Sequence, residues 1–360
     1  MFLRFLKNSY RLEYASMNIY TLLRFYRVIK SPRLKLLGFL CLHILHKRYL
    51  YILIDPSLSC NLRCRLCFFS DPDYSAATKG FFTQEDIHAL ANSVFHRGIK
   101  IQIGCGAEPM TYSRLHELVK LAHDKGIKNI SITTNGSLLT QEKLKQLVDN
   151  GLNEIVLSAH GLTKERYEYM MRGANYEHFL RLLNDIAAVK KEHPDLLFRI
   201  NYTVCEDNIE DLKELPMLFS DNLPNVIQLR PVQDIGSTAY DNYSMSSVLA
   251  QYEECILTVV HFCESNNITC IYPNKSHLSV IDEENRNKEH LHAVVDMLPC
   301  FYLLPYANWK DAFNPYEETF EAYSKRTHRI RNWLKMFLSF NKSAGQEKDS
   351  VTHSLNYVVK

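Results

Sequence analysis

Three cysteines, Cys60, Cys64 and Cys67, lie close together in the segment SLSCNLRCRLCFF. Their spacing, C-x3-C-x2-C, places three soft thiolate donors on one short loop. A structural zinc ion takes four ligands in a closed tetrahedral shell, whereas an iron–sulfur cluster held by three cysteines keeps one iron without a protein ligand. The loop therefore predicts a metal site with one position open to another molecule.

A strand-like segment precedes the cysteine loop, and similar segments recur after it. The predicted strands are Tyr49–Asp55, Lys100–Ile103, Asn129–Thr133, Glu154–Leu157, Phe198–Thr203 and Val226–Leu229. Helical segments are predicted between them, at Gln84–Phe95, Ser113–Asp124, Gln141–Val148, Tyr176–Lys190 and Ile209–Leu218. This alternation predicts an α/β fold in which a parallel sheet curls into a partial (β/α)6 TIM-like barrel.

Polar or glycine-rich stretches lie at the ends of the predicted strands. After the cysteine loop they are Gly104–Pro109, Thr133–Gly136, Ser158–Gly161, Asn201 and Gln228–Pro231. In α/β barrels the carboxyl ends of the strands meet at one face, where ligand-binding and catalytic groups collect. We therefore expect these stretches to lie around the cysteine loop.

Several of these stretches carry a resemblance to a known family. The chain resembles the radical SAM superfamily in CNLRCRLC (60–67), GAEP (106–109), TTNGSLL (133–139), the serine of SAHG (158–161) and MRG (171–173). They occur in the family's order and span about half of the chain. The similarity is closer to the branch of anaerobic maturases that often carry a C-terminal cysteine domain of the SPASM or twitch type. In this chain that region is degenerate or truncated.

The resemblance implies a cofactor pair and the residues that bind it. Cys60, Cys64 and Cys67 would hold a [4Fe–4S] cluster whose open iron is chelated by S-adenosylmethionine (SAM). One electron from the cluster would cleave SAM to methionine and a 5′-deoxyadenosyl radical, which abstracts hydrogen from a substrate. The implied SAM-binding residues are Gly106, Ala107 and Glu108 for the methionine ammonium, Ser158 for the carboxylate or ribose, Arg172 for the carboxylate, and Asn135.

The chain departs from the family pattern at three positions. Ala107 replaces the second glycine, Leu66 replaces an aromatic residue common before the third cysteine, and His160 stands where aspartate is usual. His160 is either an acid or base facing the substrate or a hydrogen-bonded structural histidine. Cys205, also near a strand end, is either a hydrogen donor to a substrate radical or a buried core thiol.

Four further cysteines lie towards the C-terminus and contain no C-x2-C pair: Cys255, Cys263, Cys270 and Cys300. Four thiolates are enough for one auxiliary cluster or a zinc ion. Cys255 and Cys263 are eight residues apart on a predicted helix and need not converge. The other interpretation is ordinary buried thiols, which pack as small apolar side chains.

The chain divides into four predicted regions: a basic amphipathic helical extension (1–48), the partial barrel (49–235), an irregular α+β region that closes the barrel (236–340) and a disordered tail (341–360). Residues 1–50 carry ten Lys/Arg and one acid, so +9, while the remainder carries 32 bases and 39 acids, so −7. The extension either lies on an acidic membrane surface or partner or forms a helical layer over the main domain.

The composition is that of a soluble protein with a sizeable core. Hydrophobic residues make up 46% of the chain and charged residues 23%, as is ordinary for a cored protein. No secretory signal or membrane span is predicted, which favours a reducing cytoplasm. No nucleic-acid-binding motif occurs.

Expected partners are a one-electron donor such as flavodoxin or ferredoxin and a peptide or protein substrate. The alternatives are a non-catalytic iron–sulfur and SAM-binding scaffold and a structural zinc protein.

Overall fold

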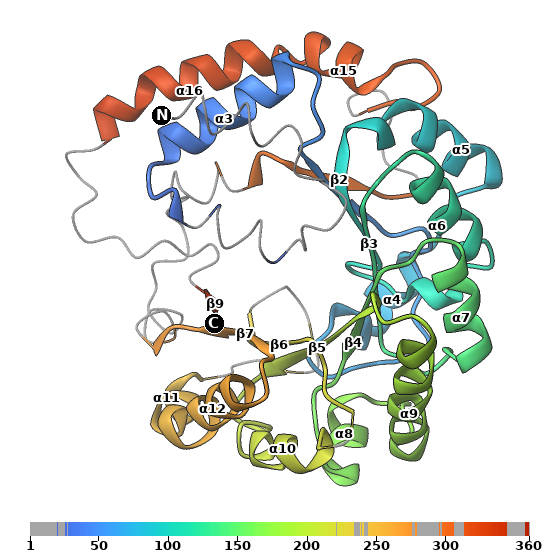
Figure 1. The fold of residues 1–360 in the computed structure, drawn as a ribbon, viewed down its shortest axis with the longest axis vertical. Helices are drawn as coiled ribbons and strands as arrows, with labels where there is room; N and C mark the ends of the chain where they lie inside the picture. Colours follow the sequence, from blue (N-terminus) through green and yellow to red (C-terminus); the bar gives the residue numbers. More distant parts are fainter. Residues whose placement is uncertain are drawn as a thin grey trace.

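The fold is built on one curved sheet that is parallel except at one edge (Figure 1). The computed structural model describes residues 20, 26, 28–220, 222–233, 238, 240, 244–275, 278, 295, 297–305, 313–343 and 357–359. The sheet order is β8-β1-β2-β3-β4-β5-β6-β7-β9. The strands are β1 (Leu50–Ile54), β2 (Gly98–Ile103), β3 (Asn129–Thr134), β4 (Glu154–Ser158), β5 (Leu197–Val204), β6 (Val226–Pro231), β7 (Thr269–Pro273), β8 (Cys300–Leu303) and β9 (Tyr357–Val359).

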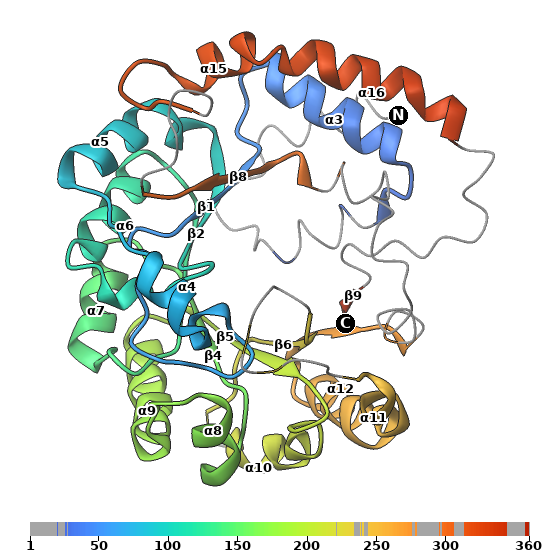
Figure 2. The same cartoon turned by 180° about the vertical axis from the view of Figure 1, so that it is seen from behind.

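Helices follow the strands and cover the convex side of the sheet (Figures 1 and 2). Four of them begin at a Thr or Asn whose side chain accepts a backbone N–H of the first turn, which stabilises that turn. The layer consists of α5 (Gln84–Ser93), α6 (Leu115–Asp124), α7 (Gln141–Asp149), α8 (Lys164–Met170), α9 (Tyr176–Glu192), α10 (Leu215–Leu218), α11 (Ser246–Ala250) and α12 (Leu257–Ser265). Alternate strand residues such as Leu50, Ile52 and Ile54 are fully buried under it.

The concave side of the sheet is lined by polar side chains. The Nζ atom of Lys100 lies 2.7 Å from Oε2 of Glu154, and both side chains are buried. Tyr20 donates its hydroxyl to Glu154, and Arg199 Nη1 donates to the Tyr20 hydroxyl at 3.2 Å. Burial opposes ionisation of Glu154, but Lys100 and Arg199 together lower its pKa. The interior of a closed TIM barrel is usually filled by branched apolar side chains. The concave side of this open sheet instead carries polar and charged side chains, which suits it to polar ligands.

Helices from the two ends of the chain lie side by side beyond β1 and β8 (Figures 1 and 2). They are α3 (Pro32–Ile44) and α16 (Arg329–Ser343), the latter preceded by α15 (Phe320–Arg326). His43 of α3, Tyr49, Phe320 and Trp333 pack edge to face against one another. This aromatic contact fixes the N-terminal helix to the C-terminal segment.

The partial-barrel prediction is confirmed, with three differences. Two parallel strands, β7 and β8, extend the predicted six-stranded barrel to eight, and β7 coincides with a segment, Thr269–Tyr272, that the sequence shows as strand-like. β8 lies in the region expected to be irregular, yet its residues pair with β1. The tail expected to be disordered contributes Tyr357–Val359 as β9, antiparallel to β7. In the described part of the chain, no helix combines the length and apolar character needed to span a membrane.

Candidate functional site

The cysteine loop is held by the loops that the sequence predicts around it. It connects β1 to the short helix η1 (Phe68–Ser70). In this loop the Arg63 N–H donates to the Arg172 carbonyl at 3.0 Å, and the Arg65 N–H donates to the Met170 carbonyl at 2.9 Å. On the other side, the Glu108 N–H donates to the Ser59 carbonyl at 3.0 Å. The cysteine loop is therefore joined by backbone contacts to the GAEP and MRG segments.

The three thiols are poorly suited to carrying negative charge unless a cation is present. Burial raises the pKa of Cys60 to about 11. Burial also raises the pKa of Cys64, with a further contribution from the neighbouring Cys67 and Cys60. It raises the pKa of Cys67 as well. Binding to a metal reverses this balance because the ligand is then the thiolate.

The donor set fits an iron–sulfur cluster better than a zinc ion. Across the described part of the chain, no three His, Cys, Asp or Glu side chains converge on a point that could hold one metal ion. A tetrahedral zinc needs such convergence, whereas a [4Fe–4S] cluster binds each cysteine at its own iron. Asn135 also directs its Nδ2 at Cys60 Sγ, 3.8 Å away, and hydrogen bonds to the sulfurs tune such clusters.

Glu108 joins the loop after β2 to the loop after β3. Its Oε1 accepts from Thr134 Oγ1 at 2.7 Å and from the Met110 N–H at 3.0 Å. Its Oε2 accepts from the Asn135 N–H at 2.8 Å. Only 3% of Glu108 is exposed, and this burial raises its pKa despite the three hydrogen bonds. An ionised carboxylate has about four acceptor positions, so these three hydrogen bonds leave one acceptor position on Oε2.

Asp55 and Tyr302 hold the Gly106 segment, although neither was predicted to belong to the site. Asp55 Oδ1 accepts the Cys105 N–H at 2.6 Å, and its Oδ2 accepts the Gly106 N–H at 3.0 Å. The Ala107 N–H also points at Oδ1, at 3.4 Å. The Tyr302 hydroxyl, from β8, donates to Oδ2 of the same carboxylate. A Cβ atom at Gly106 would lie 3.3 Å from both the Asp55 and Tyr302 oxygens, so the loop packs tightly on this pair.

The other predicted SAM-binding residues lie on neighbouring strand ends. Asn135 is buried and donates from Nδ2 to Asn61 Oδ1 at 2.9 Å, next to the first cysteine. Ser158 ends β4 and pairs in register with Asn201 of β5 on the concave side. The Arg172 side chain is exposed, while its carbonyl holds the cysteine loop. The structure thus brings the predicted segments to one edge of the sheet.

His160 and Cys205 lie in hydrogen-bonded loops after β4 and β5. The His160 Nδ1 accepts the Thr203 N–H at 3.2 Å, and the His160 carbonyl accepts from Asn208 Nδ2 at 3.0 Å. His160 therefore connects the loop after β4 to β5 and to the loop after β5. Cys205 is fully buried, and its N–H donates to Asn208 Oδ1 at 2.8 Å. A hydrogen donor must reach the substrate, so the packing favours a core thiol.

His160 gives a pH-dependent prediction. Burial and the charge of Arg230 lower its pKa from the usual 6.5 to about 4. Between these values the unfolded chain binds a proton that the folded chain does not, so acidification favours unfolding. We expect His160→Asn to lose less stability than the wild type between pH 7 and pH 5, by about 2 kcal/mol. Urea unfolding at the two pH values measures this, and equal losses in both proteins would contradict it.

The four C-terminal cysteines do not form one site. Cys255, Cys263 and Cys270 are fully buried, the first two on the segment that runs through α12 and the third on β7. Cys300 begins β8, at the opposite edge of the sheet from β7. The prediction of a shared auxiliary site is therefore wrong for this set of four. The chain returns across the sheet after β7, so Cys300 cannot be placed from spacing alone.

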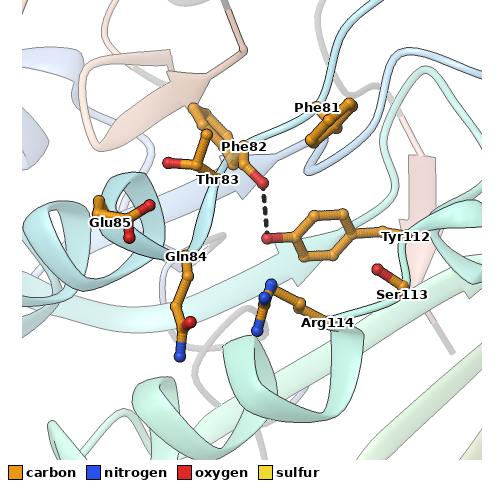
Figure 3. A pocket seen from close by; sticks show the side chains of 8 residues that line it. All are labelled: Phe81, Phe82, Thr83, Gln84, Glu85, Tyr112, Ser113 and Arg114. Carbon is orange, nitrogen blue, oxygen red and sulfur yellow. Dashed lines mark hydrogen bonds between the residues drawn. The ribbon is translucent and has the colours of Figure 1, made fainter.

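A small pocket of about 210 Å³ lies at the start of α5 (Figure 3). Its lining includes Phe81, Phe82, Gln84, Tyr112 and Arg114, and the Tyr112 hydroxyl donates to the Phe82 carbonyl at 2.9 Å. None of the predicted cluster or SAM residues lines it. We therefore assign the site to the strand ends and not to this pocket.

Residues 54–218 match the radical SAM superfamily, and this range contains the cysteine loop, Glu108, Ser158 and Arg172. The chain carries a radical SAM domain. Domains of this superfamily use a [4Fe–4S] cluster and SAM, which agrees with the donor set described above. The cofactor prediction is thereby confirmed at the level of the family.

The radical SAM domain has enzymes among its curated relatives. It is 31% identical over 145 residues to GTP 3′,8-cyclase of Peptoclostridium acidaminophilum, covering 40% of this chain and 44% of that protein. It is 30% identical over 160 residues to AdoMet-dependent heme synthase of Methanosarcina barkeri, covering 44% and 43%. The chain thus matches only about half of the length of these relatives.

Solved structures support the fold. SuiB of Streptococcus suis bound to its precursor peptide SuiA aligns with a TM-score of 0.57 at 17% identity, over 88% of this chain and 74% of that one. SuiB bound to SAM aligns with a TM-score of 0.54 at 18% identity, over 71% and 58%. At this identity the comparison supports the partial-barrel architecture.

Proposed function

We propose that the protein is a radical SAM enzyme in which Cys60, Cys64 and Cys67 hold the cluster. The observation that carries the proposal is the joining of the cysteine loop by hydrogen bonds to the segments of Glu108, Asn135 and Arg172. When bound, the cluster supplies the electron that cleaves SAM. The chain's residues bind and orient SAM: Glu108 offers an acceptor to the ammonium group, and Ser158 and Arg172 offer donors to the carboxylate.

We propose a peptide or protein substrate that binds on the concave side of the sheet. The polar lining supports this because side chains such as Thr203 and Gln228 can hydrogen-bond amide groups. Gln102 and Asn201 add to the polar character of this side but already bond to Thr133 and Arg199. SuiB, whose fold is similar, was crystallised with a precursor peptide. An external donor of the flavodoxin or ferredoxin class would reduce the cluster.

We also propose that the enzyme works in the cytoplasm and in the absence of oxygen. A further part of the proposal is that its N-terminal helix contacts a membrane. The absence of disulfides among the ten cysteines, all of which lie in described residues, fits a reducing compartment. The partly exposed cysteine loop would leave a bound cluster accessible to oxidants.

The test is anaerobic reconstitution followed by reduction with dithionite in the presence of SAM. We expect a brown protein with about four irons per chain that releases 5′-deoxyadenosine and methionine in equal amounts. Glu108→Gln is the diagnostic variant because one carboxylate oxygen becomes an NH2 group. The glutamine amide therefore cannot accept both the hydrogen bonds to Oε1 and the hydrogen bond to Oε2. A brown wild-type protein that never cleaves SAM would support the scaffold alternative, and a colourless, zinc-loaded protein would support the structural one.

A further inference from the structure

The helices α3 and α16 present an unusual concentration of exposed apolar side chains. Of the 18 large hydrophobic residues that are exposed in the described parts of the chain, ten lie within residues 28–45 and 330–338. They are Val28, Ile29, Leu34, Leu37, Leu42, Ile44, Leu45, Ile330, Leu334 and Leu338. The remaining eight are scattered over the rest of the sequence. We call the surface formed by these ten residues the α3–α16 surface.

α3 is apolar on two opposite sides. Leu36 and His43 are buried on one side, against the aromatic cluster and the sheet. Leu34, Leu37, Cys41 and Leu45 follow i, i+3, i+7, i+11 spacing on the other side, and all are exposed. A surface helix normally carries polar residues on its outer side, and an all-apolar helix is normally buried. The outer side of α3 therefore has the composition of a contact surface.

α16 continues this surface. Ile330, Leu334 and Leu338 form one i, i+4, i+8 row, with 39%, 44% and 73% exposure. Arg331 and Lys335 occupy the adjacent row and are also exposed. The two helices lie side by side (Figure 2), and Arg33 of α3 lies 6.0 Å from the centroid of the Phe337 ring. The two exposed apolar rows thus lie on neighbouring helices.

The charge on this surface has a single sign. Residues 28–48 and 327–343 contain no Asp or Glu. Their bases include Lys30, Arg33, Lys35, Lys47, Arg331 and Lys335. Arg48 and Arg329 do not belong to the surface, because Arg48 donates to the carbonyls of Phe95, Gly98 and Lys125, and Arg329 packs on Phe320 and Trp333. Residues 51–326 and 344–360 carry 28 bases and 39 acids, so −11, and the two helix segments differ from them in the sign of their charge. Exposed leucines bordered by Lys and Arg match the composition of helices that lie in the interface of an anionic bilayer.

We propose that the α3–α16 surface binds the headgroup region of an anionic lipid bilayer. The apolar rows enter the interface, and the flanking bases contact the lipid phosphates. This goes beyond a contact through the N-terminal helix alone, because the surface includes helices from both ends of the chain. The pairing of β8 with β1 brings these two ends together. It is independent of radical chemistry, since none of its residues contacts the cysteine loop or the Glu108 segment in the contacts described above.

The test is cosedimentation of the reconstituted full-length protein with vesicles of phosphatidylcholine, with and without phosphatidylglycerol. We expect binding to the anionic vesicles, weakened by high salt, and binding to neutral vesicles that is weaker by about tenfold or more. Leu34→Gln/Leu37→Gln and Arg331→Glu/Lys335→Glu should each weaken binding by a similar factor. The matched control, Met217→Gln/Leu223→Gln, replaces two exposed apolar residues at the opposite end of the fold.

Two results would overturn the proposal. One is wild-type binding that is absent or unchanged by the α3 and α16 substitutions. The other is a dimer in light scattering that Leu34→Gln/Leu37→Gln converts to a monomer, because a second copy would then cover the surface. Iron content and SAM cleavage should be equal in all these variants. A failure of the radical SAM proposal would therefore be visible separately, in the wild-type protein without vesicles.

Discussion

Replacing Cys60, Cys64 and Cys67 together by alanine will leave a colourless protein that binds no iron–sulfur cluster and cleaves no SAM. The three thiols are the only cysteines in the described chain that share one short loop. Burial raises the pKa of Cys60 and Cys64, and binding to a metal reverses this because the ligand is then the thiolate. Iron and sulfide analysis after anaerobic reconstitution measures the effect, against about four irons in the wild type.

The matched control is Cys41→Ala/Cys105→Ala. These two cysteines lie outside the loop and are more exposed to solvent than the three loop cysteines. The control should keep the full iron content and the visible absorption of the wild type. Iron retained in the triple variant, or lost in the control, would show that the cluster is held elsewhere. The buried Cys255, Cys263 and Cys270 would then be the next candidates.

Local spacing was enough to predict the cysteine loop and the strand ends. Three thiols within one loop must lie near one another whatever the rest of the fold is, so Cys60, Cys64 and Cys67 could be recognised directly. Glu108 and Ser158 follow regular β-α repeats, and parallel strands bring such positions to one edge. Register confirms this for Ser158, which pairs with Asn201.

Contacts between distant segments could not be predicted from one sequence. Tyr302 meets Asp55 across a separation of 247 residues. The four residues of β8 are too few for a reliable alternation pattern, so the C-terminal stretch was interpreted as irregular. Asp55 was visible as the last residue of a predicted strand. Its role was missed because it comes just before the cysteine loop, and its partners are backbone N–H groups of the Cys105–Ala107 segment.

The same limitation explains the C-terminal cysteines. Cys270 and Cys300 are thirty residues apart in the sequence, yet the sheet order places β7 and β8 near opposite edges. The cause is the return of the chain across the whole sheet, which no local pattern encodes. His160 differs again: its position was predicted, but its hydrogen bond to the Thr203 N–H depends on the register of β4 with β5.

Asp55→Asn will greatly weaken SAM binding while the cluster remains. The Asp55 carboxylate accepts N–H groups of Cys105 and Gly106 and the hydroxyl of Tyr302, and only 1% of Asp55 is exposed. The asparagine amide turns one acceptor into a donor that faces these same N–H groups. Each hydrogen bond to a buried charge contributes about 1.5 kcal/mol or more, so we expect a loss of about 100-fold in SAM affinity.

Tyr302→Phe tests the same contact from the other side. It removes one hydrogen bond to the carboxylate and leaves the ring, so we expect a loss of about tenfold in SAM affinity. Tyr316→Phe is the matched control because Tyr316 is also exposed and its hydroxyl donates to Asp86 at 2.6 Å, away from the site. Equilibrium SAM binding and iron content, measured on the same anaerobic samples, separate the two effects. Iron loss in Tyr302→Phe, or an equal effect of Tyr316→Phe, would show that Tyr302 acts on stability and not on the Gly106 segment.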